Sequence, residues 1–198
     1  SAEDLLKYPS MERVVIVELD EKVVDISRRY LQSVHHGALD DPRVEIRIGD
    51  GLQYVNEAGL AAAERYDLIV LDLTDPVGLA AALHTTEFFS ACRALLAEGG
   101  ALSLHVGSPV YQPERVQALV WRLRSVFAYV RPCFLYIPLY GSLWGLASAS
   151  DVVDPAALPA SEVDQRLSAR GIAGLQHLNG AVHSAQFALP NHLRALLA

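Results

Sequence analysis

Cysteine is scarce in this chain: Cys92 and Cys133 are the only two among 198 residues. They do not stand at the spacing of a metal site, and two distant cysteines make no disulfide framework. We therefore expect two free, buried thiols, Cys92 in a helix and Cys133 in a strand. Free thiols indicate a reducing compartment, so we expect a cytoplasmic protein.

Long hydrophobic runs are also lacking. The most apolar stretch, Cys133 to Ala149, is interrupted by Pro138, Gly141 and Gly145, whereas a spanning helix needs about 20 consecutive apolar residues. The polar, acidic start at residues 1–4 does not have the pattern of a signal peptide. We expect no membrane partner.

Positive charge is in deficit, with 16 Lys and Arg against 23 Asp and Glu and a net charge of −7. A face that binds a phosphate backbone would be basic, so we expect no nucleic-acid partner. An acidic chain is compatible with a cationic ligand. Hydrophobic residues make up 52% and charged residues 20%, which is an ordinary globular composition.

Strands and helices alternate along the first 150 residues. We predict strands at 13–19, 44–48, 66–71, 101–106, 129–137 and 143–148, and helices at 2–8, 21–32, 51–58, 85–97 and 113–127. Alternation of this kind predicts an α/β sheet with right-handed crossovers. Only Pro138–Ser142 separates the last two strands, so these should form an antiparallel hairpin. The predicted fold is a Rossmann-like sheet of the class I methyltransferase type, mostly parallel, with a C-terminal antiparallel hairpin.

Residues 1–150 are expected to form a nucleoside-binding catalytic domain, and residues 151–198 a tail that packs on it. Within the tail we predict a helix at 161–170, a strand at 184–189 and a last turn at 192–197.

A glycine-rich turn and a strand are absent before the first predicted helix. In this fold the first strand lies in the middle of the sheet, and its turn touches the ligand. We therefore expect strands 13–19 and 66–71 to flank a central position that this chain does not fill. Both strands are apolar nearly throughout, as for strands buried on both faces. We expect a gap of about 10 Å between them, or a strand from another chain inside it.

Carboxylates follow three of the predicted strands, at the edge where parallel sheets bind ligands. Glu18 can accept two hydrogen bonds from a ribose diol, and a surface acid that ends a strand is the alternative. Asp20 is expected to cap the following helix. Asp50, before Gly51, can accept from an adenine amine, although Asp-Gly is also a common turn pair.

Asp72 and Asp75 stand three residues apart after one strand, in the run Asp72-Leu73-Thr74-Asp75-Pro76. Two carboxylates so placed can face one alkylammonium group, and one of them can take its proton. The alternative is a turn that leads into a proline loop.

Tyr140 and Trp144 lie in and just after the hairpin turn, where they can wall a pocket for an aliphatic or cationic chain. Core packing is the alternative for Trp144. His84, His105 and His183 have no metal-ligand spacing and are interpreted as structural, and we expect no metal.

Taken in order, these motifs resemble the spermidine synthase family of polyamine aminopropyltransferases. The resemblance rests on Val17–Asp20, Asp40–Val44, Gly49–Gly51, Tyr66–Pro76, Thr86–Phe89, Pro138–Tyr140, Ser142–Gly145, His183 and Phe187–Pro190.

The resemblance implies an enzyme that transfers an aminopropyl group from decarboxylated S-adenosylmethionine to putrescine or a related polyamine. The products are spermidine and methylthioadenosine, with no prosthetic group, and the protein is expected to be a homo-oligomer. Glu18, Asp50, Gly51 and Leu79 would contact the nucleoside, with Leu79 where the family usually has proline. Asp72 would be the proton acceptor, with Asp72, Asp75 and Tyr140 binding the amine.

Two other functions remain open. A small-molecule methyltransferase that uses S-adenosylmethionine shares the sheet and the ribose acid, but has no general need for the Asp72/Asp75 pair. A truncated, non-catalytic partner subunit is favoured by the missing first strand.

Overall fold

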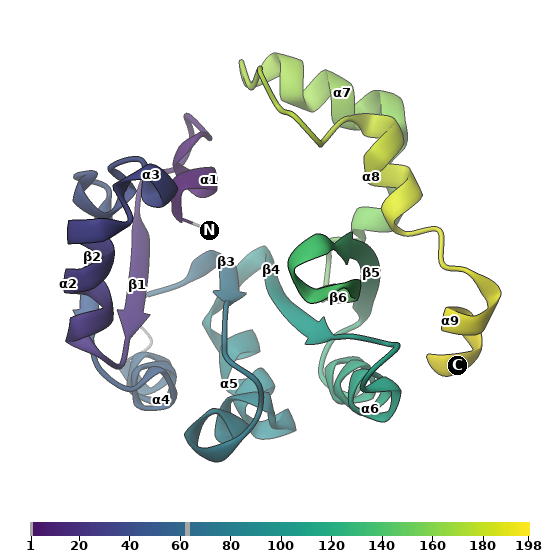
Figure 1. Ribbon diagram of the computed structural model, residues 1–198, viewed down its shortest axis with the longest axis horizontal. Helices are drawn as coiled ribbons and strands as arrows, with labels where there is room; N and C mark the ends of the chain where they lie inside the picture. The colour runs from purple at the N-terminus through teal and green to yellow at the C-terminus, as the bar shows by residue number, and fades with distance from the viewer. Residues whose placement is uncertain (1, 62–63) are drawn as a thin grey trace.

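The computed structural model describes residues 2–61 and 64–198, without the side chains of residues 59–61 and of Leu79. Within that part, strands lie in a central layer with helices on both sides (Figure 1). The strands are β1 (Val14–Glu18), β2 (Val44–Ile48), β3 (Tyr66–Leu71), β4 (Leu96–Gly107), β5 (Tyr129–Ile137) and β6 (Ser142–Ser150).

The helices follow the predicted alternation. They are α1 (Ala2–Leu6), α2 (Glu21–Tyr30), α3 (Gln32–His35), α4 (Gly51–Ala61), α5 (Thr86–Leu95), α6 (Pro113–Arg124), α7 (Ala160–Ala169), α8 (Gly180–Gln186) and α9 (Asn191–Leu196). Short 3-10 helices occur at η1 (Ala38–Asp40), η2 (Gly78–His84), η3 (Pro138–Tyr140) and η4 (Pro155–Ala157).

The sheet is divided into two parts. β1 pairs in parallel with β2, and a second sheet has the order β3-β4-β6-β5. β3 and β4 are parallel, whereas β6 runs antiparallel to both β4 and β5. The α/β fold with a C-terminal antiparallel hairpin is therefore confirmed.

The hairpin closes where the short connection predicts. β5 and β6 pair from Tyr129 opposite Ser150 to Ile137 opposite Ser142, with η3 as the turn. Gly145 is needed in β6, because a Cβ there would come within 2.6 Å of Val106 Cγ2 and 2.7 Å of Phe134 Cε1.

β1 and β3 do not pair with each other anywhere in the described residues, although their arrowheads point the same way in Figure 1. The expected absence of a ladder between them is thus confirmed. An ion pair joins the two parts at the strands' amino ends instead. Arg13, before β1, contacts Glu64, before β3, at 3.1 Å, and it also contacts Glu45 of β2 within its own part at 2.6 Å.

Burial of β3 differs from the expectation, and most of α2 is exposed. Leu68 and Val70 of β3 are each 39% exposed, so β3 is not buried on both faces. Among the apolar residues of α2, Val24 is buried, while Val23 and Ile26 remain exposed. Leu68 and Val70 are two residues apart, so the exposure falls on one face of β3. Helix α2 packs on β1 and α3, which leaves the rest of its apolar side exposed.

The main hydrophobic core lies between the larger sheet and the helices α4, α5 and α6, which line one face in Figure 1. Helix α5 begins at a cap, because the Thr85 hydroxyl accepts a hydrogen bond from Phe88 N. That cap places Phe89 and Cys92 inward, with no exposed surface. Cys92 is a buried free thiol as predicted, but Cys133 is only partly buried because it lies in β5, the strand at the edge of the described sheet.

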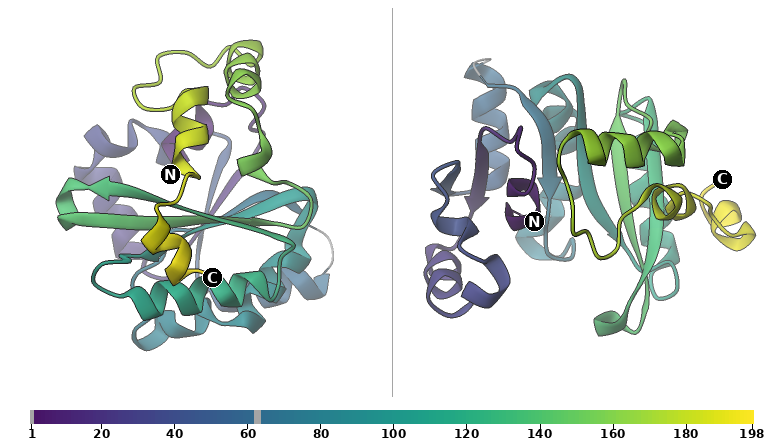
Figure 2. Two further views of the ribbon diagram at one scale, coloured as in Figure 1. Left: turned by 90° about the vertical axis from the view of Figure 1, so that its right-hand side faces the viewer. Right: turned by 90° about the horizontal axis from the view of Figure 1, so that it is seen from above.

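Residues 151–198 run over the other face and then around the end of the sheet (Figure 2). The predicted strand at 184–189 is wrong, because Asn179 caps a helix there by accepting from Val182 N. The last helix α9 is bound to α6: Gln117 Nε2 donates to Leu196 O at 2.6 Å, and Leu197 lies in the core.

Candidate active site

Glu18 ends β1, directly beside the end of β2. The backbone N–H of Gly49 donates to Glu18 O at 2.9 Å, so the residues that follow the two strands are neighbours. Glu18 Oε1 accepts from Asp20 N at 3.0 Å. Its other oxygen accepts no bond within the described residues. Asp20 also caps α2 as predicted, since it accepts from Lys22 N.

Asp50 follows β2 and directly precedes α4. Its Oδ1 accepts from Leu52 N at 2.8 Å and its backbone carbonyl accepts from Tyr54 N. One carboxylate oxygen therefore fixes the helix start, and the other receives no hydrogen bond in the part of the chain described. Gly51 is the first residue of the helix. Leu79 lies in η2, but its side chain is outside the described residues.

Asp72 and Asp75 follow β3, the strand that stands across from β1. Both residues are exposed. Asp75 Oδ1 accepts from Arg115 Nη2 at 3.1 Å. This hydrogen bond, more than any other contact, holds the pKa of Asp75 below its ordinary value, so the carboxylate remains ionised.

His105 lies beside this acidic pair, at the end of β4. Its Nε2 is hydrogen-bonded to Leu73 O, between the two aspartates. A carbonyl only accepts, so Nε2 carries the proton and Nδ1 of the neutral ring is an acceptor. Nδ1 is buried and has no partner among the described residues. An N–H of a ligand would satisfy it.

Aromatic rings extend this side of the site. The His105 ring stacks on Trp144 with centroids 5.9 Å apart, and Trp144 lies 4.4 Å from Tyr140. Tyr140 is 48% exposed, so part of its ring is accessible to a ligand. Rings of this kind attract an alkylammonium group.

The structure thus forms two groups of predicted residues. One contains Glu18 and Asp50, and the other contains Asp72, Asp75 and Tyr140. The two groups follow strands that do not pair with each other in the described chain.

Sequence reasoning assigned His105 to a structural role and did not consider Arg115. The position of His105 at the end of a predicted strand was a usable signal, because the same rule selected Asp72. No comparable signal marks Arg115, which comes from the first turn of α6. His84 is buried and bonded to Ala80 O, and burial lowers the pKa of its imidazole. His183 bonds to Pro155 O.

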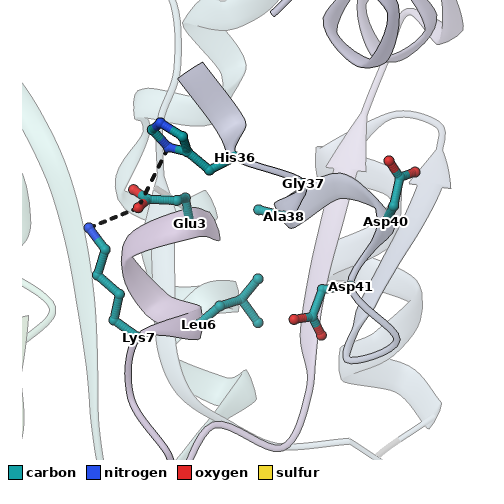
Figure 3. Close-up of a pocket in the computed structure, with 8 residues that line it drawn as sticks. All are labelled: Glu3, Leu6, Lys7, His36, Gly37, Ala38, Asp40 and Asp41. Atoms are coloured by element: carbon teal, nitrogen blue, oxygen red, sulfur yellow. Dashed lines mark ion pairs between the residues drawn. The ribbon is translucent and has the colours of Figure 1, made fainter. Parts of the chain in front are cut away.

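A cavity of about 290 Å³ lies elsewhere, between α1 and the segment after α3 (Figure 3). Glu3 lines it and contacts Lys7 at 2.9 Å and His36 at 3.8 Å. The cavity also borders η1 and Asp41, which lead into the amino end of β2. It therefore lies at the edge opposite the strand ends that carry Glu18 and Asp50.

The described residues form neither a metal-binding cluster nor a helix that could span a membrane. No group of three or more His, Cys, Asp or Glu side chains there is arranged to hold a metal ion. No helix in the same residues has the length and apolar character needed to cross a membrane.

Comparison with known proteins gives consistent relatives. The sequence model of the spermine/spermidine synthase domain matches residues 1–155. A polyamine aminopropyltransferase of Nitrosomonas europaea is 46% identical over the whole chain and 60% of its own length. Polyamine aminopropyltransferase 2 of Hyperthermus butylicus is 39% identical over 98% of this chain and 63% of its own length. The chain thus spans about three-fifths of these relatives.

Solved structures agree with these relatives. A crystal structure of a spermidine synthase in complex with the transition-state analogue AdoDATO superposes with a TM-score of 0.85 and 32% identity. It is matched over 97% of this chain and 63% of its own. The spermidine synthase of Thermotoga maritima gives a TM-score of 0.83, also at 32% identity, over 97% of this chain and 62% of its own.

Proposed function

We propose, from the premise that this chain belongs to the spermine/spermidine synthase family, that the protein containing it is a polyamine aminopropyltransferase. The reaction transfers the aminopropyl group of decarboxylated S-adenosylmethionine to putrescine. The products are spermidine and methylthioadenosine. No prosthetic group takes part.

The observation that carries this proposal is a continuous set of contacts beside the Asp72/Asp75 pair. Leu73, between the two aspartates, contacts His105, which stacks on Trp144, which in turn contacts Tyr140. Carboxylates, a buried nitrogen acceptor and exposed aromatic faces together suit an aliphatic amine. A methyl acceptor in general does not require a double anion.

Nucleoside binding is assigned to the group that contains Glu18 and Asp50. Glu18 binds the ribose hydroxyls, while Asp50 and Gly51 bind the adenine, with Leu79 against the nucleoside. In support of this, Glu18 and Asp50 each have one oxygen bonded to backbone and a second oxygen without a partner in the described residues. A carboxylate held in this way is oriented before the ligand arrives.

Asp72 is assigned as the group that accepts the proton of the attacking amine. An alkylamine has a pKa near 10.4, so removing its proton to form the free base at pH 7 costs roughly 4–5 kcal/mol. Asp72 accepts that proton as the amine nitrogen bonds to the carbon next to the sulfonium. The carbon–sulfur bond breaks, and its electron pair leaves with methylthioadenosine as a neutral thioether. Asp75 and Tyr140 hold the amine in line for this displacement.

The remaining assignments follow the same proposal. Residues 1–150 form the nucleoside-binding catalytic domain, residues 151–198 pack on it as a tail, and the protein is a cytoplasmic homo-oligomer. Light scattering of the purified natural protein measures the oligomeric state directly.

The deciding experiment supplies the natural protein containing this sequence with putrescine and one of two donors. We expect spermidine and methylthioadenosine by mass spectrometry with decarboxylated S-adenosylmethionine, and no methylated amine with S-adenosylmethionine. Methyl transfer alone would instead indicate a methyltransferase. No transfer from either donor would favour the non-catalytic partner subunit. The same assay with spermidine in place of putrescine shows which of the two amines is the better acceptor.

A further inference from the structure

The carboxylate of Asp75 is held on one side only. Its Oδ1 accepts a single hydrogen bond, from Arg115 Nη2 at 3.1 Å, and its Oδ2 accepts none within the described residues. One oxygen is thus occupied by the protein, while the other is available to a donor from outside.

Arg115 is the fixed member of this ion pair. Its side chain is 21% exposed, against 51% for Asp75. Its Nη1 donates to Gln112 Oε1 at 2.8 Å, and the Gln112 backbone N–H donates to Ser108 O at 2.9 Å. The guanidinium is therefore attached to the segment that joins β4 to α6.

The backbone at the end of β4 passes close to this guanidinium. Gly107 has φ +96, a conformation that L side chains rarely adopt. The position of a Cβ there lies 3.5 Å from Gln112 Oε1 and 4.0 Å from Arg115 Cζ. Because β4 also supplies His105, the same strand end positions both the arginine and the histidine beside the acidic pair.

We propose that Arg115 is a positioning residue, which orients Asp75 so that Oδ2 receives an N–H of the acceptor amine. This inference rests on the proposed function. Arg115 does not fill the place of the amine, because it makes one bond to Asp75 and gives its other terminal nitrogen to Gln112. Asp75 stays ionised beside this permanent cation and is a weak base. The division of roles follows: Asp75 binds the ammonium group, and Asp72 takes the proton.

The first test is kinetic and uses Arg115→Gln in the natural protein. We expect the KM for putrescine to rise roughly 3- to 10-fold, about the net contribution of one ordinary hydrogen bond. The kcat and the affinity for methylthioadenosine should stay near the wild-type values. Arg115→Lys, which keeps the charge but cannot hold both partners, should give an intermediate KM. An unchanged KM, or a lower one because Arg115 competes with the amine, would overturn the inference.

Arg93→Gln is the matched control. Arg93 also pairs with an aspartate, Asp151, at 2.5 Å, but this pair joins α5 to the end of β6 and lies outside the site. We expect the control to leave the KM unchanged. An equal rise in both variants would show a general effect of lost positive charge and overturn the inference.

The second test does not depend on turnover. Titration of the Asp75 carboxyl carbon by ¹³C NMR should give a higher pKa in Arg115→Gln than in the wild type. The groups that act on Asp75 are Arg115, His105 and His84, and only the first is changed. The same pKa in both proteins would overturn the inference. A shifted pKa in a protein without aminopropyl transfer would instead refute the proposed function and leave the Arg115–Asp75 contact in place.

Discussion

Asp72 is the single residue on which the proposed chemical step depends. Asp72→Asn keeps the size of the side chain but removes the proton acceptor. We expect kcat to fall by about 10²–10⁴, the usual contribution of a positioned base. Methylthioadenosine affinity, measured by calorimetry, should change little, because Asp72 is assigned to the amine.

Asp67→Asn is the control for this variant. Asp67 is an exposed aspartate of the same strand, near the opposite end of β3. Its replacement should leave turnover near the wild-type level. Near-normal turnover in Asp72→Asn would show that the base lies elsewhere.

Glu18 gives a second test at the scale of one residue. Glu18→Gln retains an oxygen that can accept from Asp20 N, but it removes the charge from the ribose hydrogen bonds. We expect methylthioadenosine binding to weaken by about 1–3 kcal/mol, the range for hydrogen bonds to charged groups. Glu21→Gln, in the exposed first turn of α2, should bind as the wild type does. Equal affinities for Glu18→Gln and the wild type would move the ribose contact to another residue.

Helix α5 begins at Thr86, and Thr85 before it is the cap. Loss of a threonine cap costs about 1 kcal/mol, within a range of about 0.5–2. We expect Thr85→Ala to lower the free energy of unfolding by this amount, because α5 places Phe88 and Leu95 in the core. Urea unfolding followed by circular dichroism measures the change.

Thr86→Ala is the matched control for the cap. Thr86 is the first residue of α5, and its side chain accepts no capping bond. We expect no comparable loss of stability in this variant. A larger loss for Thr86→Ala than for Thr85→Ala would place the helix start one residue later.

The acid stability of the whole molecule follows from its paired carboxylates. Partners lower the pKa of Asp4, Asp41, Glu45, Glu64, Asp75 and Asp154. A carboxyl with a lowered folded-state pKa contributes stability above its ordinary pKa, and that contribution is lost as the pH falls through the folded value. We therefore expect the urea midpoint to fall steadily as the pH decreases from about 5 toward 2.

Asp41 is the clearest contributor to this dependence. Hydrogen bonds from the Arg43 side chain and backbone lower the pKa of Asp41 from 3.8 to about 2. Asp41→Asn should be less stable than the wild type at pH 6, and the two proteins should converge near pH 2. The exposed residue Glu12 supplies the control, since Glu12→Gln should follow the wild-type curve. Curves for Asp41→Asn and wild type that stay parallel to pH 2 would contradict the assignment.

The local pattern of the sequence was enough to predict most strands, the hairpin and the acidic site residues. The strand ranges 44–48, 66–71 and 129–137 agree with β2, β3 and β5, because alternation and turn residues act over short distances. The five-residue connection at Pro138–Ser142 was enough to predict the antiparallel hairpin. The rule that ligands bind at strand ends selected Glu18, Asp50 and the Asp72/Asp75 pair.

Only the tertiary structure decided which side chains come together across the chain. Arg115 reaches Asp75 over 40 residues, and His105 reaches Leu73 over 32. The strand order fixes such contacts, and no local pattern contains it. Burial was decided in the same way: the apolar residues Leu68 and Val70 share one face of β3 and stay partly exposed, whereas Leu71 on the other face lies in the core. Apolar sequence therefore specified a strand, while its neighbours in space determined whether that strand was covered.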